Sequence, residues 1–177
     1  MLESFLLTMV KSKDLNLFIG RAFKEKTSFN LPKDLFKGNG MTLPNIPIKI
    51  SYGQHGGIQV SFMGSKGTVR RLCKWGQSYI IYNELFMVGE LDQKYAMRHT
   101  LTGKLSNVKG ETVEIVIKMD ILNQSSCFYL GKPNFGGVLL GQLLKKNASN
   151  FILEIEPHAD VILMFCLAII SRFAQDV

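Results

Sequence analysis

Short segments in which apolar and polar residues alternate fill most of the chain from residue 48 onwards. The clearest covers residues 111–122 (ETVEIVIKMDIL), where apolar residues alternate with Glu114 and Lys118. A period of two places successive side chains on opposite faces of a β-strand. About eleven such segments follow one another, separated by turn residues at intervals of about 8–12 residues, which is typical of an all-β barrel or sandwich.

A different pattern near the C-terminus predicts one helix that is apolar on every side. Residues 161–170 are ten consecutive apolar residues, and a predicted strand and a turn at Pro157 precede them. We predict a helix over residues 158–174, with Asp160 as its N-cap and Arg172 in its last turn. Ten residues rise about 15 Å as a helix, whereas a membrane span needs about 20 apolar residues. A buried core helix is therefore favoured, and an interfacial or membrane-inserted segment is the alternative.

The two patterns together predict the fold class. A helix that is apolar all round must be surrounded by other elements, and many antiparallel strands precede it. A barrel of eight strands is filled by its own side chains, so a barrel that encloses a helix needs more strands. We therefore expect a mostly β (α+β) fold, in which a closed antiparallel β-barrel of about 12 strands surrounds a central hydrophobic C-terminal helix. One domain over residues 1–177 is expected for this length.

The first quarter of the chain is less regular. Apolar residues spaced three and four apart predict an N-terminal amphipathic helix over residues 1–12, packed on the main body, with a membrane anchor as the alternative. Residues 15–23 suit a strand, and residues 24–47 contain several prolines, glycines and lysines that indicate a long irregular loop. The N-terminus has no basic region before its apolar residues, so we predict no signal peptide.

Charge is distributed unequally between the two halves of the chain. Residues 1–75 hold 12 Lys and Arg against 4 Asp and Glu (+8), and residues 76–177 hold 9 against 10 (−1), which gives the net charge of +7. An excess of positive charge in one half indicates a polyanionic partner: nucleic acid, an anionic membrane surface or a phosphorylated ligand. The alternative is that the charge serves solubility.

The candidate binding residues form two basic clusters. Arginine suits bidentate contacts with phosphate, and the tryptophan beside the second cluster is a residue type that prefers a lipid–water interface. Arg70 and Arg71 are adjacent, so on a strand one of them points inward unless the strand lies at a sheet edge. The alternative is a solvated strand face. The clusters are Arg21, Lys24 and Lys26, and then Lys66, Arg70, Arg71 and Lys74, with Trp75.

No residue pattern indicates catalysis. The three histidines (His55, His99 and His158) are far apart in sequence, and none has a Cys, Asp or Glu at metal-ligand spacing. The three cysteines show no paired spacing, which indicates an intracellular chain with reduced thiols. We therefore predict a non-enzymatic protein with no catalytic residues, no metal and no cofactor.

Two segments resemble the tubby and phospholipid scramblase superfamily. Residues 147–173 (NASNFILEIEPHADVILMFCLAIISRF) are similar to the ending of these proteins, and residues 17–31 (LFIGRAFKEKTSFNL) to the first basic strand pair of tubby proteins. The resemblance implies a closed barrel of about twelve strands around the C-terminal helix. It also implies lipid binding, with Arg21 or Lys24 and Lys26 as a loose match to the tubby lipid-binding pair. The acidic scramblase loop is replaced by Asn147-Ala148-Ser149, so calcium binding is not expected.

Charge and resemblance together favour a module that binds anionic phospholipid headgroups, such as phosphoinositides, at a membrane surface. The expected location is the cytoplasm, and the alternatives are a peripheral membrane location and the nucleus. One alternative is a nucleic-acid-binding or transcription-linked barrel that uses the same basic residues. Another is scramblase-like lipid transport, which the resemblance implies but which the short helix does not favour. An enzyme or small-molecule carrier is the third.

Overall fold

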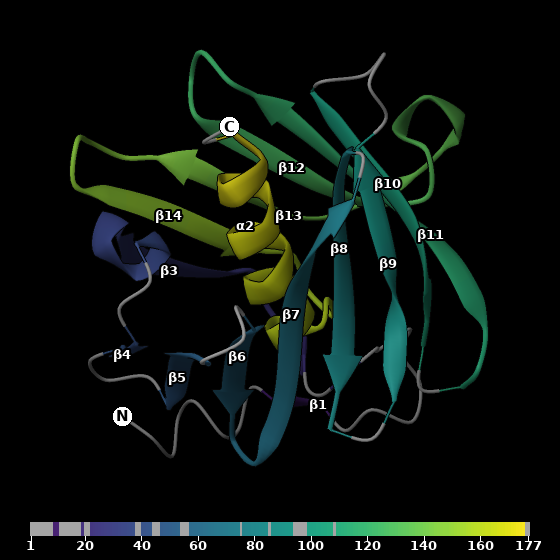
Figure 1. Cartoon of the computed structure of the whole chain (residues 1–177), viewed down its shortest axis with the longest axis horizontal. Coiled ribbons are helices and arrows are strands. Elements are labelled where there is room, and N and C mark those ends of the chain that lie inside the picture. The colour runs from purple at the N-terminus through teal and green to yellow at the C-terminus, as the bar shows by residue number, and fades with distance from the viewer. Residues whose placement is uncertain are drawn as a thin grey trace.

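One antiparallel sheet curves around one helix in a computed structural model of the protein (Figure 1). The structure describes residues 9–10, 19, 22–37, 40–43, 47–53, 57–74, 76–84, 86–93, 99–107 and 109–175. Within them the sheet contains twelve strands, which confirms a mostly β fold with one C-terminal helix. Its strands are β3 (Thr27–Pro32), β4 (Met41–Thr42), β5 (Ile48–Tyr52), β6 (Gly57–Phe62), β7 (Ser65–Lys74), β8 (Gly76–Asn83), β9 (Met87–Gln93), β10 (Thr100–Ser106), β11 (Thr112–Asp120), β12 (Ser125–Leu130), β13 (Val138–Lys145) and β14 (Asn150–Ile155).

Neighbouring strands in the sheet are mostly neighbours in sequence. From β4 to β14 each strand pairs with the next, and β3 is added to the outer edge of β14. The alternation predicted for residues 111–122 is confirmed in β11, where Ile115 and Ile117 are buried and Lys118 is exposed. Val116 on the opposite face is buried as well, so the outer face of the sheet is not uniformly solvated.

The helix α2 (Val161–Gln175) lies within the curve of the sheet, and its side chains are buried from Val161 to Arg172. It begins three residues later than predicted, because His158 adopts a left-handed conformation (φ 67°) and donates its backbone N–H to the carbonyl of Phe23 at 2.8 Å. The predicted N-cap is confirmed: Asp160 Oδ1 accepts from the backbone N–H of Leu163 at 2.9 Å. No helix in the described part of the chain is long and apolar enough to cross a membrane.

Two glycines allow the sheet to approach the helix closely. A Cβ on Gly67 of β7 would lie 2.7 Å from Ile162 Cγ2, and a Cβ on Gly141 of β13 would lie 3.3 Å from Met164 Sδ. A Cβ on Gly67 would displace the side chain of Ile162. A Cβ on Gly141 would also lie 2.5 Å from the backbone oxygen of Glu154, so the backbone would have to shift there. The buried apolar side chains of the inner sheet face and of α2 therefore form one continuous core.

The N-terminal region departs from the predicted pattern. Met9–Val10 forms β1, which pairs with β2 (Ala22–Phe23), so the predicted helix is wrong at residues 9–10. The other residues of that predicted helix, 1–8 and 11–12, lie outside the described residues. Pairing with β2 determines that residues 9–10 form a strand, because β2 is anchored to the core through the buried side chains of Ala22 and Phe23.

The predicted irregular loop also contains regular structure. Its residues form β3, the 3-10 helix η2 (Lys33–Phe36) and β4. Phe29 and Leu31 alternate with the exposed Ser28 and Asn30, and this short alternation was hidden among charged residues and prolines.

The strands β3 and β4 lie at the two ends of the sheet order, and no described ladder joins them. The segment η2 lies between them in sequence, and its Leu35 is completely buried. The Tyr52 hydroxyl of β5 donates a hydrogen bond to the Leu35 carbonyl, which links η2 to the β4 side of the sheet. A second 3-10 helix, η3 (Pro133–Phe135), connects β12 to β13.

Candidate anion-binding surface

The two ends of α2 define two ends of the sheet. Gln175 Nε2 at the end of the helix donates to the Ser125 carbonyl and to Ser126 Oγ, both at 3.0 Å, so α2 ends beside the first residues of β12. Because successive strands run in opposite directions, the last residues of β7 and the turns that follow β11 and β13 all lie at this end. We call it the C-terminal end of the sheet, and Figure 1 shows the β11–β12 and β13–β14 turns projecting there.

The N-terminal strands β1 and β2 lie at the opposite end, where α2 begins. The buried carboxylate of Asp160 accepts the backbone N–H of Ile19 at 2.8 Å through Oδ2, while its Oδ1 caps α2. Ala22 also forms a bridge with Asp160. We call this the N-terminal end of the sheet, since α2 begins there.

The described residues of the first predicted cluster lie at the N-terminal end. Lys26 Nζ contacts Glu156 at 2.9 Å and Glu154 at 3.0 Å, at the end of β14 that leads to α2. Hydrogen bonds from Gln142 and then Lys26 hold the pKa of Glu154 below its usual value, and Glu156 and Glu154 raise the pKa of Lys26. Two carboxylates thus already compensate the charge of Lys26. Lys24 is exposed, and Arg21 lies outside the described residues.

The second predicted cluster is divided along β7. Lys66, at the start of the strand, forms an ion pair with Glu84 (3.4 Å) at the N-terminal end. Arg70 lies on the outer face, and its guanidinium carbon is 5.4 Å from the ring centre of Tyr82. The side chain of Lys74 and all of Trp75 lie outside the described residues. The residues that are close in sequence are therefore spread over the length of a strand.

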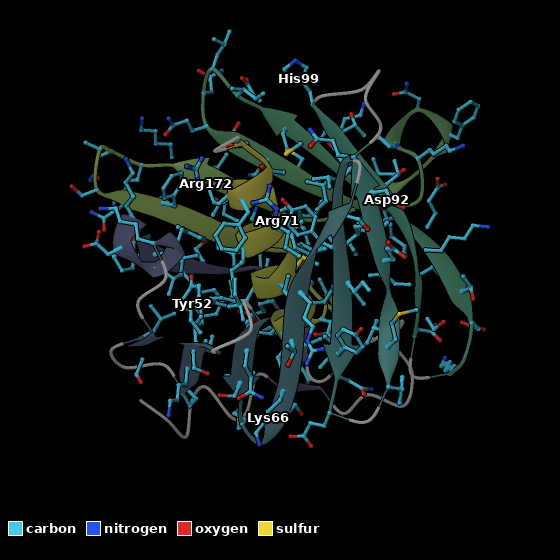
Figure 2. All side chains as sticks on the ribbon, in the orientation of Figure 1. Tyr52, Lys66, Arg71, Asp92, His99 and Arg172 are labelled. Atoms are coloured by element: carbon cyan, nitrogen blue, oxygen red, sulfur yellow. The ribbon has the colours of Figure 1, made fainter. Side chains whose placement is uncertain are left out.

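Arg71 reaches the C-terminal end on the inner face of the sheet. It shares this face with the buried Gly67 and Val69, yet its side chain is exposed, and Figure 2 shows it beside α2, far along β7 from Lys66. Its strand partner is Tyr79, which is completely buried. Burial raises the pKa of Tyr79 to about 12, and the nearby charge of Arg71 partly opposes this shift. The prediction that one of the two adjacent arginines faces inward is thus confirmed.

Three lysines that sequence reasoning did not select join Arg71 at this end. Lys33 begins η2, and its backbone N–H donates to the carbonyl of Ser149 in the β13–β14 turn at 2.8 Å. That turn carries Lys145 and Lys146, and Lys146 Nζ donates to Asn30 Oδ1 at 3.3 Å. The pairing of β3 with β14 therefore joins residues that are more than a hundred positions apart.

We define the cationic rim as these four side chains. All are exposed, and none forms an ion pair with a carboxylate in the described part of the chain. The nearby acid Asp34 is itself paired with Lys37 at 2.7 Å. No local pattern could have identified the rim, because it depends on a long-range strand pairing. Its members are Lys33, Arg71, Lys145 and Lys146.

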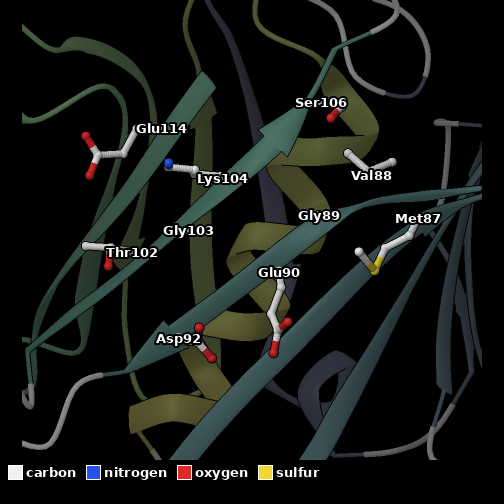
Figure 3. Close-up of a pocket in the computed structure, with 10 residues that line it drawn as sticks. All are labelled: Met87, Val88, Gly89, Glu90, Asp92, Thr102, Gly103, Lys104, Ser106 and Glu114. Carbon is white, nitrogen blue, oxygen red and sulfur yellow. The ribbon is translucent and has the colours of Figure 1, made fainter. Parts of the chain in front are cut away.

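A groove of about 520 Å³ on the outer face of β9–β11 has the opposite character (Figure 3). Glu90, Asp92 and Glu114 contribute carboxylates to its lining, and Lys104 contributes a single cation. The Ser78 hydroxyl donates a hydrogen bond to Glu90. The groove is thus suited to cations, and it does not extend the cationic rim.

The described residues offer no arrangement for a metal ion. No group of three or more His, Cys, Asp or Glu side chains among them could hold one. His99 and His158 lie in separate turns, and His55 lies outside the described residues. Burial raises the pKa of the Cys166 thiol, which disfavours the thiolate needed for nucleophilic or metal chemistry.

No protein-family model matches the chain, and no curated protein matches it.

Proposed function

We propose that the protein is a non-enzymatic module that binds the anionic headgroups of a phospholipid membrane through the cationic rim. The observation that carries this proposal is the gathering of Lys33, Arg71, Lys145 and Lys146 at one end of the sheet without ion-pair partners among the described residues. Three separate elements supply these side chains, so the fold places positive charges from distant parts of the sequence at one end of the sheet. Such a surface favours a polyanionic ligand.

The strength expected of the rim fits reversible recruitment to a membrane. Each Lys or Arg near an anionic bilayer contributes about 1 kcal/mol, so four contribute about 4 kcal/mol. Lys26 and Lys66 would contribute less, because their carboxylate partners would have to be displaced or would approach the membrane with them. The rim shares Arg71 with the two basic clusters predicted from the sequence and adds Lys33, Lys145 and Lys146.

The proposal includes the closed barrel implied by the tubby and scramblase resemblance, and phosphoinositides as the headgroups. Closure is supported by η2, whose buried Leu35 is linked by its carbonyl to Tyr52 across the gap between β3 and β4. A closed wall would hold the turns of the rim in fixed positions. Phosphoinositides offer several phosphates to a cluster of cations, which suits the bidentate geometry of Arg71.

Co-sedimentation with vesicles tests the function directly. Vesicles of phosphatidylcholine alone are compared with vesicles that also contain phosphatidylserine or a phosphoinositide, and duplex DNA is added as a competitor. We expect binding to both anionic vesicles, little to the neutral vesicle, and a loss of binding as the ionic strength rises from about 0.1 M to about 0.5 M. Equal binding to neutral and anionic vesicles would contradict the proposal. Complete displacement by DNA at matched phosphate concentration would favour the nucleic-acid alternative instead.

A further inference from the structure

An apolar turn projects from the same end of the sheet as the cationic rim. Leu122, between β11 and β12, is 96% exposed, and its neighbour Ile121 is 41% exposed. The strand that follows this turn pairs with β13, where Ser126 opposes Leu143, two residues before Lys145. The apolar turn and the basic β13–β14 turn therefore project from neighbouring hairpins.

The apolar turn is held in one shape by its own polar residues. Asp120 Oδ1 accepts the backbone N–H of Asn123 at 3.0 Å, and Asp120 Oδ2 accepts the side-chain amide of Asn123 at 2.6 Å. The N–H of Gln124 donates to the Ile121 carbonyl at 3.3 Å, and Gln124 is left-handed at φ 50°. A leucine presented on an ordered turn loses little conformational freedom on binding, which favours a surface contact. We call residues 120–124 the Leu122 tip.

A second exposed apolar turn lies at the other end of β12 and has different surroundings. Phe135 of η3 is 85% exposed. The backbone N–H of Gly131, at the start of that turn, donates to the carbonyl of Glu114 at 2.7 Å, and Glu114 lines the acidic groove. Phe135 is therefore a matched residue for comparison, because it is similarly exposed but lies away from the cationic rim.

We propose that Leu122 and Ile121 enter the headgroup region of an anionic membrane while the cationic rim binds its surface. This inference rests on the proposed function and adds the orientation: the C-terminal end of the sheet faces the lipid. The combination is the usual one for interfacial binding, in which buried apolar area adds to electrostatic attraction. Insertion remains shallow, because the charged Asp120 lies two residues from Leu122 and would be costly to place in hydrocarbon.

Tryptophan quenching by brominated lipids measures which turn enters the membrane. Leu122→Trp and Phe135→Trp are each compared with the parent protein, whose own Trp75 sets the background. On vesicles that contain phosphatidylserine, we expect Leu122→Trp to show a blue-shifted emission and additional quenching, and Phe135→Trp to show neither. If the parent binds these vesicles while the tryptophan at position 122 stays unquenched, the insertion is wrong and the proposed function stands. If the parent does not bind them, both are wrong.

Affinity gives a second readout that does not depend on an added tryptophan. Leu122→Ser should weaken binding to anionic vesicles about five- to tenfold, since partial burial of a leucine is lost. Phe135→Ser should change the affinity less than about twofold, because no apolar burial is lost at that turn. Equal effects of the two substitutions would overturn the proposal. So would a blue shift of Leu122→Trp that appears without lipid at high protein concentration, which would indicate that a second copy of the chain covers the tip.

Discussion

The two ends of the sheet present positive charge in different ways. At the N-terminal end, Lys26 lies between Glu154 and Glu156, and Lys66 is paired with Glu84. At the C-terminal end, Lys33 and Arg71 have no such partner among the described residues. Lys26 and Lys66 are also exposed, but their charge is compensated by neighbouring carboxylates, whereas a cation without a carboxylate partner is available to a ligand.

Strand β7 carries both a cation with a carboxylate partner and a cation without one among the described residues. Lys66 near its first residue is paired, and Arg71 near its last residues is exposed at the opposite end (Figure 2). The net charge of a segment therefore says little about where an anion would bind. The position of each side chain relative to the carboxylates of neighbouring strands is decisive.

The largest expected effect is on stability, at the N-terminal end. Asp160→Ala removes the acceptor for the backbone N–H groups of Ile19 and Leu163; the hydrogen bond from Leu163 is buried, and the one from Ile19 is partly buried. Losing a helix cap and leaving a buried donor unpaired should lower the free energy of unfolding by about 2–3 kcal/mol. Urea denaturation measures the change. Asp160→Asn retains one of the two acceptor oxygens and should lose less than Asp160→Ala; a loss of less than about 1 kcal/mol in Asp160→Ala would contradict the role of these hydrogen bonds.

The two adjacent arginines of β7 test whether binding to anionic vesicles depends on the C-terminal end or on the outer face of the sheet. Arg71→Gln removes one rim cation and should weaken binding to anionic vesicles about fivefold, from a contribution of about 1 kcal/mol. Arg70→Gln removes an equal charge from the outer face, where Arg70 lies over Tyr82, and should change the affinity less than about twofold. Vesicle titration of both variants measures the difference. A larger loss in Arg70→Gln would place the binding surface on the outer face of β5–β8.

A smaller effect on stability is expected when the hydrogen bond between Tyr52 and Leu35, which links η2 to the β4 side of the sheet, is removed. Tyr52→Phe removes the hydroxyl that donates to the Leu35 carbonyl and should lower the free energy of unfolding by about 1 kcal/mol. If η2 closes the wall, hydrogen exchange should also increase at residues 33–36 before it increases in β11. Unchanged exchange in η2 would mean that the hydroxyl does not hold the two edges together.

The smallest effect concerns pH at the N-terminal end. Hydrogen bonds from Gln142 and Lys26 depress the pKa of Glu154 below its ordinary value of 4.5, so the native state favours the carboxylate. The resulting stabilisation is present above pH 4.5 and is lost as the pH falls through the native pKa. Glu154→Gln should therefore be slightly less stable than the wild type at pH 7 and equally stable near pH 2. A difference that persists in acid would indicate a cause other than ionisation.

The sequence was most informative about the core. Ten consecutive apolar residues, a proline turn and Asp160 were sufficient to predict a buried helix, because burial on every side and a capped start are local properties. The alternation in β11 likewise predicted which of its residues face inward. At β1 the prediction of a helix was wrong, since a short apolar segment suits either element and its pairing with β2 decided the outcome.

The candidate surface was much less predictable. Arg71 was selected because it belongs to a basic cluster in sequence, but that cluster is spread along a strand in the structure. Lys33 and Lys146 are brought to the same end by the pairing of β3 with β14 and by the contact between Lys33 and Ser149. A carboxylate partner such as Glu154 for Lys26 also lies far away in sequence. Long-range pairing therefore determines both which cations gather and which are compensated.

Removal of the same number of positive charges from each end, in two separate variants, tests the central claim most directly. One variant carries Lys33→Gln, Lys145→Gln and Lys146→Gln, and the other carries Lys24→Gln, Lys26→Gln and Lys66→Gln, so that both lose three positive charges. If the C-terminal end faces the membrane, vesicle titration should show the first variant bound about a hundredfold more weakly than the wild type, at about 1 kcal/mol for each lysine. The second should stay within about threefold of the wild type, because two of its three lysines are already paired. Equal losses, or a larger loss in the second variant, would contradict the account.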